Sequence, residues 1–254
     1  MYSGNIYSED SLSVLKEDIS NCWNPERFSL SRYPKYVDTI GNKTAFSSDK
    51  ISCLDMVIKC PFCSLKNPYS DKGIIEFIDR CVEFEKKINP YWTHYYIYLT
   101  IDQRMVKPGF THRREGIHFD GMQGVAYPQK MPVCHSYLVA DALPTRFYTH
   151  PFLATHLSEA NDNWYVQFER QAQLEAVFYP SEFDIFLMSA YQVHEAVEAL
   201  SLTKRTFMRL EFSLKKYNRV GNTLNPLIPV DWRFVDREIP IHLREKAFKD
   251  TGWD

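Results

Sequence analysis

The segment GIHFDGMQG, residues 116–124, places a histidine and a carboxylate two positions apart between glycines. Side chains alternate along an extended strand, so His118 and Asp120 point to the same side and can converge on one ion. A third ligand must come from elsewhere, and His194, at the end of the apolar stretch FDIFLMSAYQVH, is the best candidate. Two imidazoles and one carboxylate on one face of an ion leave the opposite positions open, as in non-haem Fe(II) sites that bind a cosubstrate and O2.

The stretch RTFMRLEFSL, which follows His194, carries its charges on one face. Counted by twos, Arg205, Arg209 and Glu211 share a face of the expected strand, and the opposite face is apolar. Burying both arginines would cost several kcal/mol unless each were paired. This face is therefore either solvated, as on an edge strand, or meets an anion. A dicarboxylate is such an anion, because an arginine fork can hold a carboxylate by two parallel hydrogen bonds.

With these residues the chain resembles the Fe(II)/2-oxoglutarate-dependent dioxygenases. The resemblance rests on the H-x-D at 118–120, on Asp184 ten residues before His194, and on Arg205 eleven residues after it. It covers roughly residues 95–215. One departure concerns the turn before the apolar strand, where the family has glycine and this chain has Glu182 or Phe183.

The resemblance implies a mainly β fold with supporting helices and a double-stranded β-helix, jelly-roll or cupin-like core. It implies Fe(II), 2-oxoglutarate and O2 as cofactor and cosubstrates, and a hydroxylase or related oxidoreductase as the function. The metal ligands would be His118, Asp120 and His194. The cosubstrate would be bound by Arg205 or Arg209, and Tyr137 in VCHSYLVAD is expected to touch it. A core tyrosine with a satisfied hydroxyl is the alternative for Tyr137.

Two other classes of function remain open. A cupin-like metalloenzyme that does not use 2-oxoglutarate would share the three ligands but would not need Arg205. A non-catalytic metal- or ligand-binding barrel would turn over no cosubstrate. The primary substrate is not defined by the sequence, since an amino acid, a peptide, a protein side chain and a small metabolite all fit, and the oligomeric state is equally open.

Hydrophobic periodicity predicts helices before strands. Leu12, Leu15 and Ile19 share a face of a short helix at 11–21, and the segment 71–88 is an amphipathic helix that can cover the apolar face of a sheet. Residues 22–70 show no clear pattern. From residue 95 onward, apolar and aromatic runs broken by Pro and Gly predict strands, with residues 143–173 as an insertion between them.

Composition agrees with one globular domain of 254 residues, with 44% hydrophobic residues and an aromatic content that favours strands. We expect residues 1–92 to form a helical or irregular support, 93–216 the catalytic core, and 217–254 a C-terminal extension. The formal net charge of -2 gives no support for nucleic-acid binding. The N-terminal stretch has no signal-peptide pattern and no apolar run is long enough to span a membrane, so we expect a cytoplasmic protein.

Two further motifs have open interpretations. The six cysteines fit reduced thiols, and Cys60 and Cys63 form a C-x-x-C that could be unreactive, bind a structural metal or act in redox chemistry. The segment THRREG, residues 111–116, precedes the H-x-D. Its Arg113 or Arg114 either faces an acidic group of the primary substrate at the cavity mouth or belongs to a solvated loop.

Overall fold

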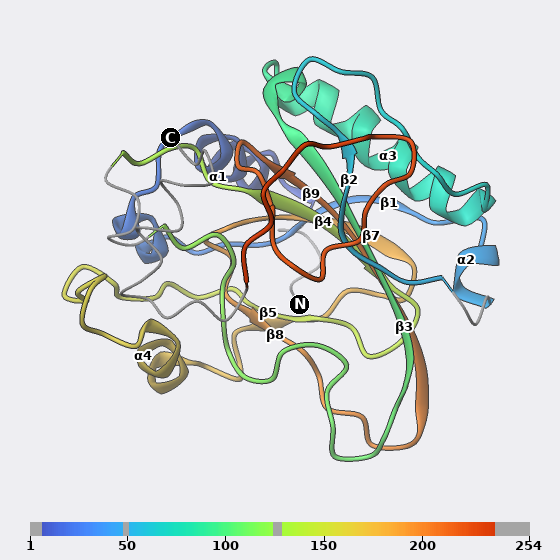
Figure 1. Ribbon diagram of the computed structural model, residues 1–254. Helices are drawn as coiled ribbons and strands as arrows, with labels where there is room; N and C mark the ends of the chain where they lie inside the picture. Colours follow the sequence, from blue (N-terminus) through green and yellow to red (C-terminus); the bar gives the residue numbers. More distant parts are fainter. Residues whose placement is uncertain (1–6, 48–50, 124–128, 237–254) are drawn as a thin grey trace.

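The computed structural model describes residues 7–47, 51–123 and 129–236 (Figure 1). Gly124, residues 1–6 and residues 237–254 of the expected C-terminal extension lie outside this part of the chain. The elements, in chain order, are α1 (Glu9–Ser20), η2 (Pro25–Ser29), β1 (Lys35–Thr39), α2 (Thr44–Ser47), β2 (Cys53–Lys59), α3 (Lys72–Ile88), η3 (Trp92–His94), β3 (Tyr96–Val106), β4 (His135–Ala140), β5 (Arg146–Tyr148), α4 (Trp164–Gln171), β6 (Val177–Phe178), β7 (Asp184–Ser189), β8 (His194–Glu195) and β9 (Thr203–Ser213).

The strands form two antiparallel sheets. The larger has six strands in the order β1-β7-β4-β9-β3-β2, and the smaller has three in the order β6-β5-β8. The chain changes sheet between β4 and β5, between β6 and β7, and again on each side of β8. This alternation is the winding of a double-stranded β-helix. The fold is therefore mainly β with a jelly-roll core and supporting helices, as the sequence predicted.

Helix α3 covers the apolar face of the larger sheet, which confirms the helix predicted at 71–88. Asp71 caps it by accepting the amides of Gly73 and Ile74 at 2.8 and 3.1 Å. Its buried stripe packs against the inward-facing apolar residues of β9. These residues belong to one core cluster, which includes Ile74, Phe77, Ile78, Cys81, Met208, Leu210 and Phe212. The opposite face of β9 is thereby left toward the smaller sheet.

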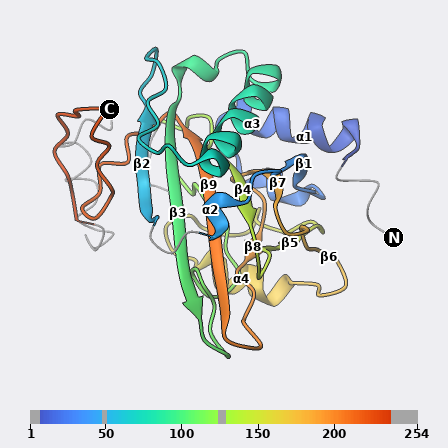
Figure 2. The ribbon, with the colours of Figure 1, turned by 90° about the vertical axis from the view of Figure 1, so that its right-hand side faces the viewer.

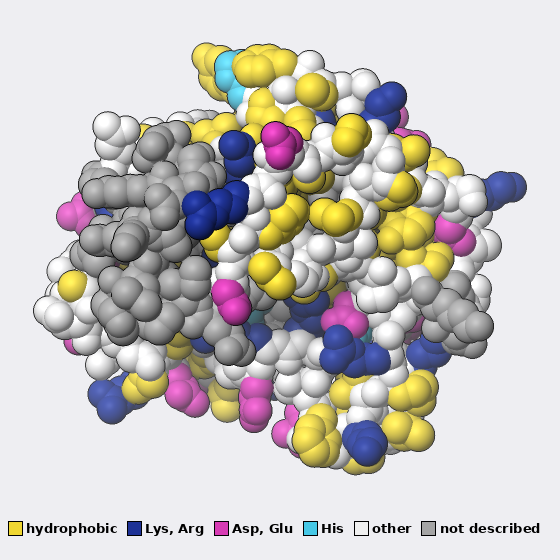
Figure 3. All heavy atoms as spheres, viewed as in Figure 1, with side chains coloured by type: hydrophobic (Ala, Val, Ile, Leu, Met, Phe, Trp, Pro, Cys, Tyr) yellow, Lys and Arg dark blue, Asp and Glu magenta, His cyan; other side chains and the backbone are white. Residues whose placement is uncertain are grey.

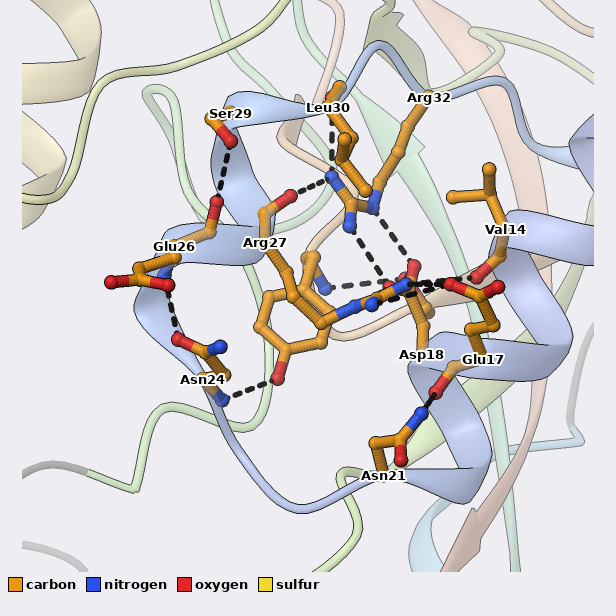
Figure 4. A network of polar contacts seen from close by, with 12 residues as sticks. Val14, Glu17, Asp18, Asn21, Asn24, Glu26, Arg27, Ser29, Leu30 and Arg32 are labelled. Atoms are coloured by element: carbon orange, nitrogen blue, oxygen red, sulfur yellow. Dashed lines mark hydrogen bonds and ion pairs between the residues drawn. The ribbon is translucent and has the colours of Figure 1, made fainter.

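Helix α1 is held against β7 by a buried carboxylate (Figure 4). Asp18 is 1% exposed and accepts two hydrogen bonds from Arg32, at 2.8 and 2.9 Å. It also accepts one from Arg27 at 2.5 Å and one from the Ser189 hydroxyl on β7 at 2.8 Å. The charge of Asp18 is compensated at every oxygen, as burial in the protein interior requires. Ser8 caps the start of α1 by accepting the Ser11 amide at 3.1 Å.

Three parts of the fold differ from the sequence prediction. The unassigned residues 22–70 supply strands β1 and β2 of the larger sheet. The supposed insertion at 143–173 contains β5, the central strand of the smaller sheet, as well as helix α4. The segment 117–120 forms an isolated bridge at His118 in place of a strand. Each of these segments is short or irregular in register, so its apolar pattern does not reach a clear period.

The C-terminal part that the structure describes lies along the outer edge of β2 (Figure 2). Thr223 exchanges hydrogen bonds with the backbone of Leu54, and Asn225 donates to the Val57 carbonyl at 2.9 Å. An exposed sheet edge is thus covered. No helix within the described ranges has the length and apolar character needed to cross a bilayer.

Candidate metal centre and cosubstrate pocket

The two predicted histidine ligands are joined through their backbones. The amide of His118 donates to the carbonyl of His194, and the amide of His194 donates to the carbonyl of His118, both at 2.9 Å. This antiparallel bridge connects the segment after Gly116 to β8 and sets the two imidazole centroids 4.4 Å apart. The expected convergence of these histidines is therefore produced by a single bridge, and a continuous strand at 117–120 is not needed.

Hydrogen bonds fix the orientation of both imidazoles. The Nδ1 of His118 lies 2.7 Å from the Gly116 carbonyl, and the Nδ1 of His194 lies 2.9 Å from the Gln192 carbonyl. A carbonyl only accepts, so each Nδ1 carries a proton, and the neutral form of each ring has its lone pair on Nε2. Metal-binding histidines are held in this way by a hydrogen bond at the other ring nitrogen.

Asp120 completes a group of three side chains whose ligand atoms all lie within 4.8 Å of one another. Among the described residues, no other group of three or more His, Cys, Asp or Glu side chains lies close enough together to hold a metal. Gly121, directly after Asp120, has a φ of +73°, and a Cβ there would lie 2.6 Å from the Cys134 sulfur. Glycine is required at this position, because both the backbone conformation and the lack of space exclude a side chain.

Electrostatics favour the protonation states that a metal needs. Burial lowers the pKa of His194 to about 4, with a further contribution from neighbouring His118, so its ring is neutral near pH 7. Burial alone would raise the pKa of the Asp120 carboxyl. Electrostatic interactions with the neighbouring groups His194, Arg209, His118 and Arg113 outweigh burial and lower it, so Asp120 is ionised.

The three side chains open into a cavity of about 560 Å³, within the ~300–1,000 Å³ range of small-molecule sites. Charged side chains and a histidine meet in a hollow below the centre of the molecular face in Figure 3, over β5 and β8. Besides the three candidate ligands, the cavity is lined by Asp102, Arg104, Thr111, His112, Arg113, Arg114, Leu138, Thr145, Met188, Ala196, Arg205, Phe207 and Arg209.

Arg205 enters this cavity without a carboxylate partner. It is 2% exposed, and its Nε donates to the Ala142 carbonyl at 2.8 Å. Its Nη1 donates to Nδ1 of His112 at 3.0 Å, which makes His112 a neutral ring with the proton on Nε2, 3.2 Å from Asp102. Among the described residues no carboxylate lies within ion-pairing distance of Arg205. Burial, followed by repulsion from Arg113, lowers its pKa to about 10.

Arg209 has the opposite surroundings. It lies 2.8 Å from Asp55, 3.3 Å from Glu211 and 3.6 Å from Asp120. Burial would lower its pKa, but these carboxylates outweigh burial and raise it. Both arginines line the cavity, as their shared face on the strand predicted, and Arg209 is the one that reaches the candidate ligand Asp120. Arg209 is neutralised by protein groups, whereas Arg205 has its charge available for a ligand.

Tyr137 lies outside the cavity, contrary to expectation. Its hydroxyl donates to Glu85 on α3 at 2.7 Å, and His135 contacts the same carboxylate at 2.9 Å. Alternation along β4 explains this: Leu138 faces the cavity, so its neighbour faces the helix. Tyr137 is the core tyrosine with a satisfied hydroxyl that the sequence left as the alternative.

Several cavity residues were missed by the sequence analysis. His112 directly precedes the two arginines of THRREG, and Asp102 alternates with Arg104 on β3, so a search for polar alternation would have found Asp102. Asp55 has no such signal, because it reaches Arg209 from the irregular strand β2.

Cys60 and Cys63 close a turn in which the Cys63 amide donates to the Cys60 carbonyl, and both thiols are free.

Comparison with known proteins gives distant similarities in fold. No protein-family model matches the sequence, and no curated protein matches it. Solved structures similar to the chain include an oxidoreductase of the 2OG-Fe(II) oxygenase family from Burkholderia pseudomallei, 15% identical, covering 68% of this chain and 69% of that chain with a TM-score of 0.35.

Two more similar structures are that of AviO1 from Streptomyces viridochromogenes Tue57 and that of EvdMO1. EvdMO1 is 11% identical, covers 80% of this chain and 50% of that chain, and has a TM-score of 0.41. AviO1 is 12% identical, covers 89% of each chain and has a TM-score of 0.34. The assignment of the site rests on its own geometry.

Proposed function

We propose that the protein is an Fe(II)/2-oxoglutarate-dependent dioxygenase that couples oxidative decarboxylation of 2-oxoglutarate to hydroxylation, or a related oxidation, of a second substrate. The observation that supports this best is the convergence of His118, Asp120 and His194 in one cavity with Arg205, a buried guanidinium without a carboxylate partner. A metal site alone would fit many reactions. Arg205, which has no carboxylate partner within the described part of the chain and lies in the same cavity, adds a place for a dicarboxylate cosubstrate.

The donor set fits Fe(II). Two imidazoles with free Nε2 atoms and one ionised carboxylate are the protein ligands of non-haem Fe(II) oxygenases, and they leave positions open for other ligands. Iron bound there supplies the activation of O2 and the decarboxylation of the oxoacid to succinate and CO2.

The protein residues hold and orient the reactants. Arg205 would bind the far carboxylate of 2-oxoglutarate through its free N–H groups, while Ala142 and His112 fix the direction of the guanidinium. Arg209 would hold Asp120, Asp55 and Glu211 in place as a structural counter-charge. Leu138, Met188 and Phe207 line the cavity with apolar surface that limits the access of water.

The direct test is anaerobic addition of Fe(II) and 2-oxoglutarate to the purified protein. We expect the weak visible charge-transfer band of an oxoacid chelated to iron, and succinate release once O2 is admitted. Tight binding of zinc without any binding of 2-oxoglutarate would contradict the proposal. Iron binding and O2 consumption without succinate would instead favour a cupin-like metalloenzyme.

Substitution of a ligand separates the metal site from the fold. His194→Ala should lower succinate formation at least ~100-fold, because loss of a ligand exceeds the effect of its supporting residues. The fold should persist, since the core residues of β7 are untouched. The matched control is His156→Ala, which removes an exposed histidine outside the cavity and should leave turnover unchanged. Normal turnover in a folded His194→Ala protein would remove His194 from the site.

A further inference from the structure

The cavity carries more positive charge than iron and 2-oxoglutarate require. Its lining contains five arginines, namely Arg104, Arg113, Arg114, Arg205 and Arg209, against the two carboxylates Asp102 and Asp120. Asp120 would be shared with the metal, Arg205 with the cosubstrate, and Arg209 is compensated by Asp55 and Glu211. The remaining three arginines face a single carboxylate, Asp102.

Asp102 already contacts other side chains that can donate hydrogen bonds to it. Arg104 reaches it with two nitrogens, the closest contact being 2.7 Å, and His112 lies 3.2 Å from it. Arg113 comes no closer than 3.4 Å. Hydrogen bonds to a charged acceptor are normally about 2.7–2.9 Å, so Asp102 compensates Arg104 well and Arg113 poorly. The charge of Arg113, on the loop before the metal-binding segment, is therefore only weakly compensated.

The guanidinium of Arg113 is held in a fixed place. It stacks over the Phe207 ring at 5.0 Å, and the guanidinium of Arg205 lies 5.1 Å from the centroid of the same ring. Phe207 thereby positions two cations in one cavity. Burial, followed by repulsion from Arg209, lowers the pKa of Arg113, so an anion bound there would relieve an existing cost.

We propose that the primary substrate carries an anionic group, a carboxylate, sulfate or phosphate, and that Arg113 binds this group in the same cavity as the 2-oxoglutarate bound by Arg205. The inference rests on the proposed function for its second anion. Residues 112 and 113 then serve two ligands from one loop, because His112 holds Arg205 and Arg113 faces the substrate. A fork of planar N–H donors suits all three anions.

The test uses inorganic sulfate as the probe, in anaerobic protein loaded with Fe(II) and 2-oxoglutarate at constant ionic strength. Calorimetry should show that sulfate binds without displacing 2-oxoglutarate. Arg113→Gln should weaken sulfate binding at least tenfold and change 2-oxoglutarate affinity less than twofold. The matched control is Arg114→Gln, the adjacent exposed arginine that stacks on Tyr165, which should weaken sulfate less than threefold. Repeating the titration with acetate and phosphate ranks the anionic group.

Four results would overturn the inference: no sulfate binding, sulfate binding indifferent to Arg113→Gln, an equal loss in Arg114→Gln, or a loss of 2-oxoglutarate affinity in Arg113→Gln, which would make Arg113 a second cosubstrate residue. If Arg113→Gln does not fold, competition in the unaltered protein decides, because mutual exclusion of sulfate and 2-oxoglutarate contradicts two separate anion sites. If 2-oxoglutarate never binds but sulfate binds through Arg113, the proposed function fails and the anion site stands.

Discussion

Arg205 and Arg209 lie on the same face of β9, four residues apart, and differ in their partners. Arg209 contacts three carboxylates, whereas Arg205 contacts a carbonyl and a neutral imidazole. A buried arginine that the protein itself neutralises stabilises the fold. A buried arginine without a counter-charge is costly unless a ligand supplies one.

Substitution of each arginine should therefore have a different consequence. Arg205→Met should weaken 2-oxoglutarate binding at least ~10-fold, in line with about 1.5–3 kcal/mol for a charge-assisted contact. Arg209→Met should remove the buried positive charge that contacts Asp55, Glu211 and Asp120, and lower the free energy of unfolding by about 3–5 kcal/mol. Anaerobic titration of 2-oxoglutarate and urea unfolding measure the two effects. A larger loss of cosubstrate affinity in Arg209→Met would reverse the assignment.

For single residues, the sequence predicted which ones lie at the site better than it predicted where their side chains point and which groups they contact. His118, Asp120, His194, Arg205 and Arg209 do line one cavity, because spacing and alternation decide which side chains share a face. Which arginine is neutralised depends on Asp55, a residue distant in sequence that alternation on β9 does not reveal. Tyr137 was placed on the wrong side, since nothing in its strand alone distinguishes the face under α3 from the face over the cavity.

The elements that position the site include two that the sequence left unassigned. β2 supplies Asp55 and β5 pairs with the β8 strand of His194. β5 spans only Arg146–Tyr148, and β2 changes register twice against β3. Such strands are stabilised by pairing with strands that are distant in sequence, so their own residues show little hydrophobic periodicity. The long elements α3, β3 and β9 were predicted because they keep one face apolar over many residues.

The contact between α1 and β7 depends on Asp18 and not on the adjacent carboxylate, Glu17. Asp18→Ala should lower the free energy of unfolding by about 3–5 kcal/mol, because it leaves Arg32, 6% exposed, without its carboxylate. Glu17→Ala is the matched control. Glu17 is 60% exposed and reaches Arg27 only at 3.4 Å, so its loss should cost no more than about 1 kcal/mol. Urea unfolding of both variants compares them, and equal losses would mean that the buried network does not hold α1 in place.

Across the whole molecule, tyrosine hydroxyls join segments that are distant in sequence. Tyr98 donates to the Lys215 carbonyl at 2.8 Å, Tyr191 accepts the Asn24 amide at 2.8 Å, and Tyr137 reaches α3. Burial raises the pKa of Tyr95 and Tyr191 to about 12, and it also raises the pKa of Tyr98, Tyr137 and Tyr217 well above the ordinary value. The folded protein therefore keeps these phenols neutral at a pH where an unfolded chain ionises them.

This difference predicts a loss of stability in alkali. An unfolded tyrosine ionises near pH 10, whereas folded Tyr95 and Tyr191 stay protonated to about pH 12, so the unfolded state binds fewer protons in this window and stability falls as pH rises. Each such tyrosine should contribute a slope of about 1.4 kcal/mol per pH unit above pH 10. Urea unfolding at about pH 8, 10 and 11 measures the slope. Tyr95→Phe, which removes the hydroxyl that donates to the Ile19 carbonyl at 3.4 Å, should reduce the slope by one tyrosine's share. Folded protein whose tyrosinate absorbance develops fully near pH 10 would contradict the prediction, because the buried phenols would then ionise without unfolding.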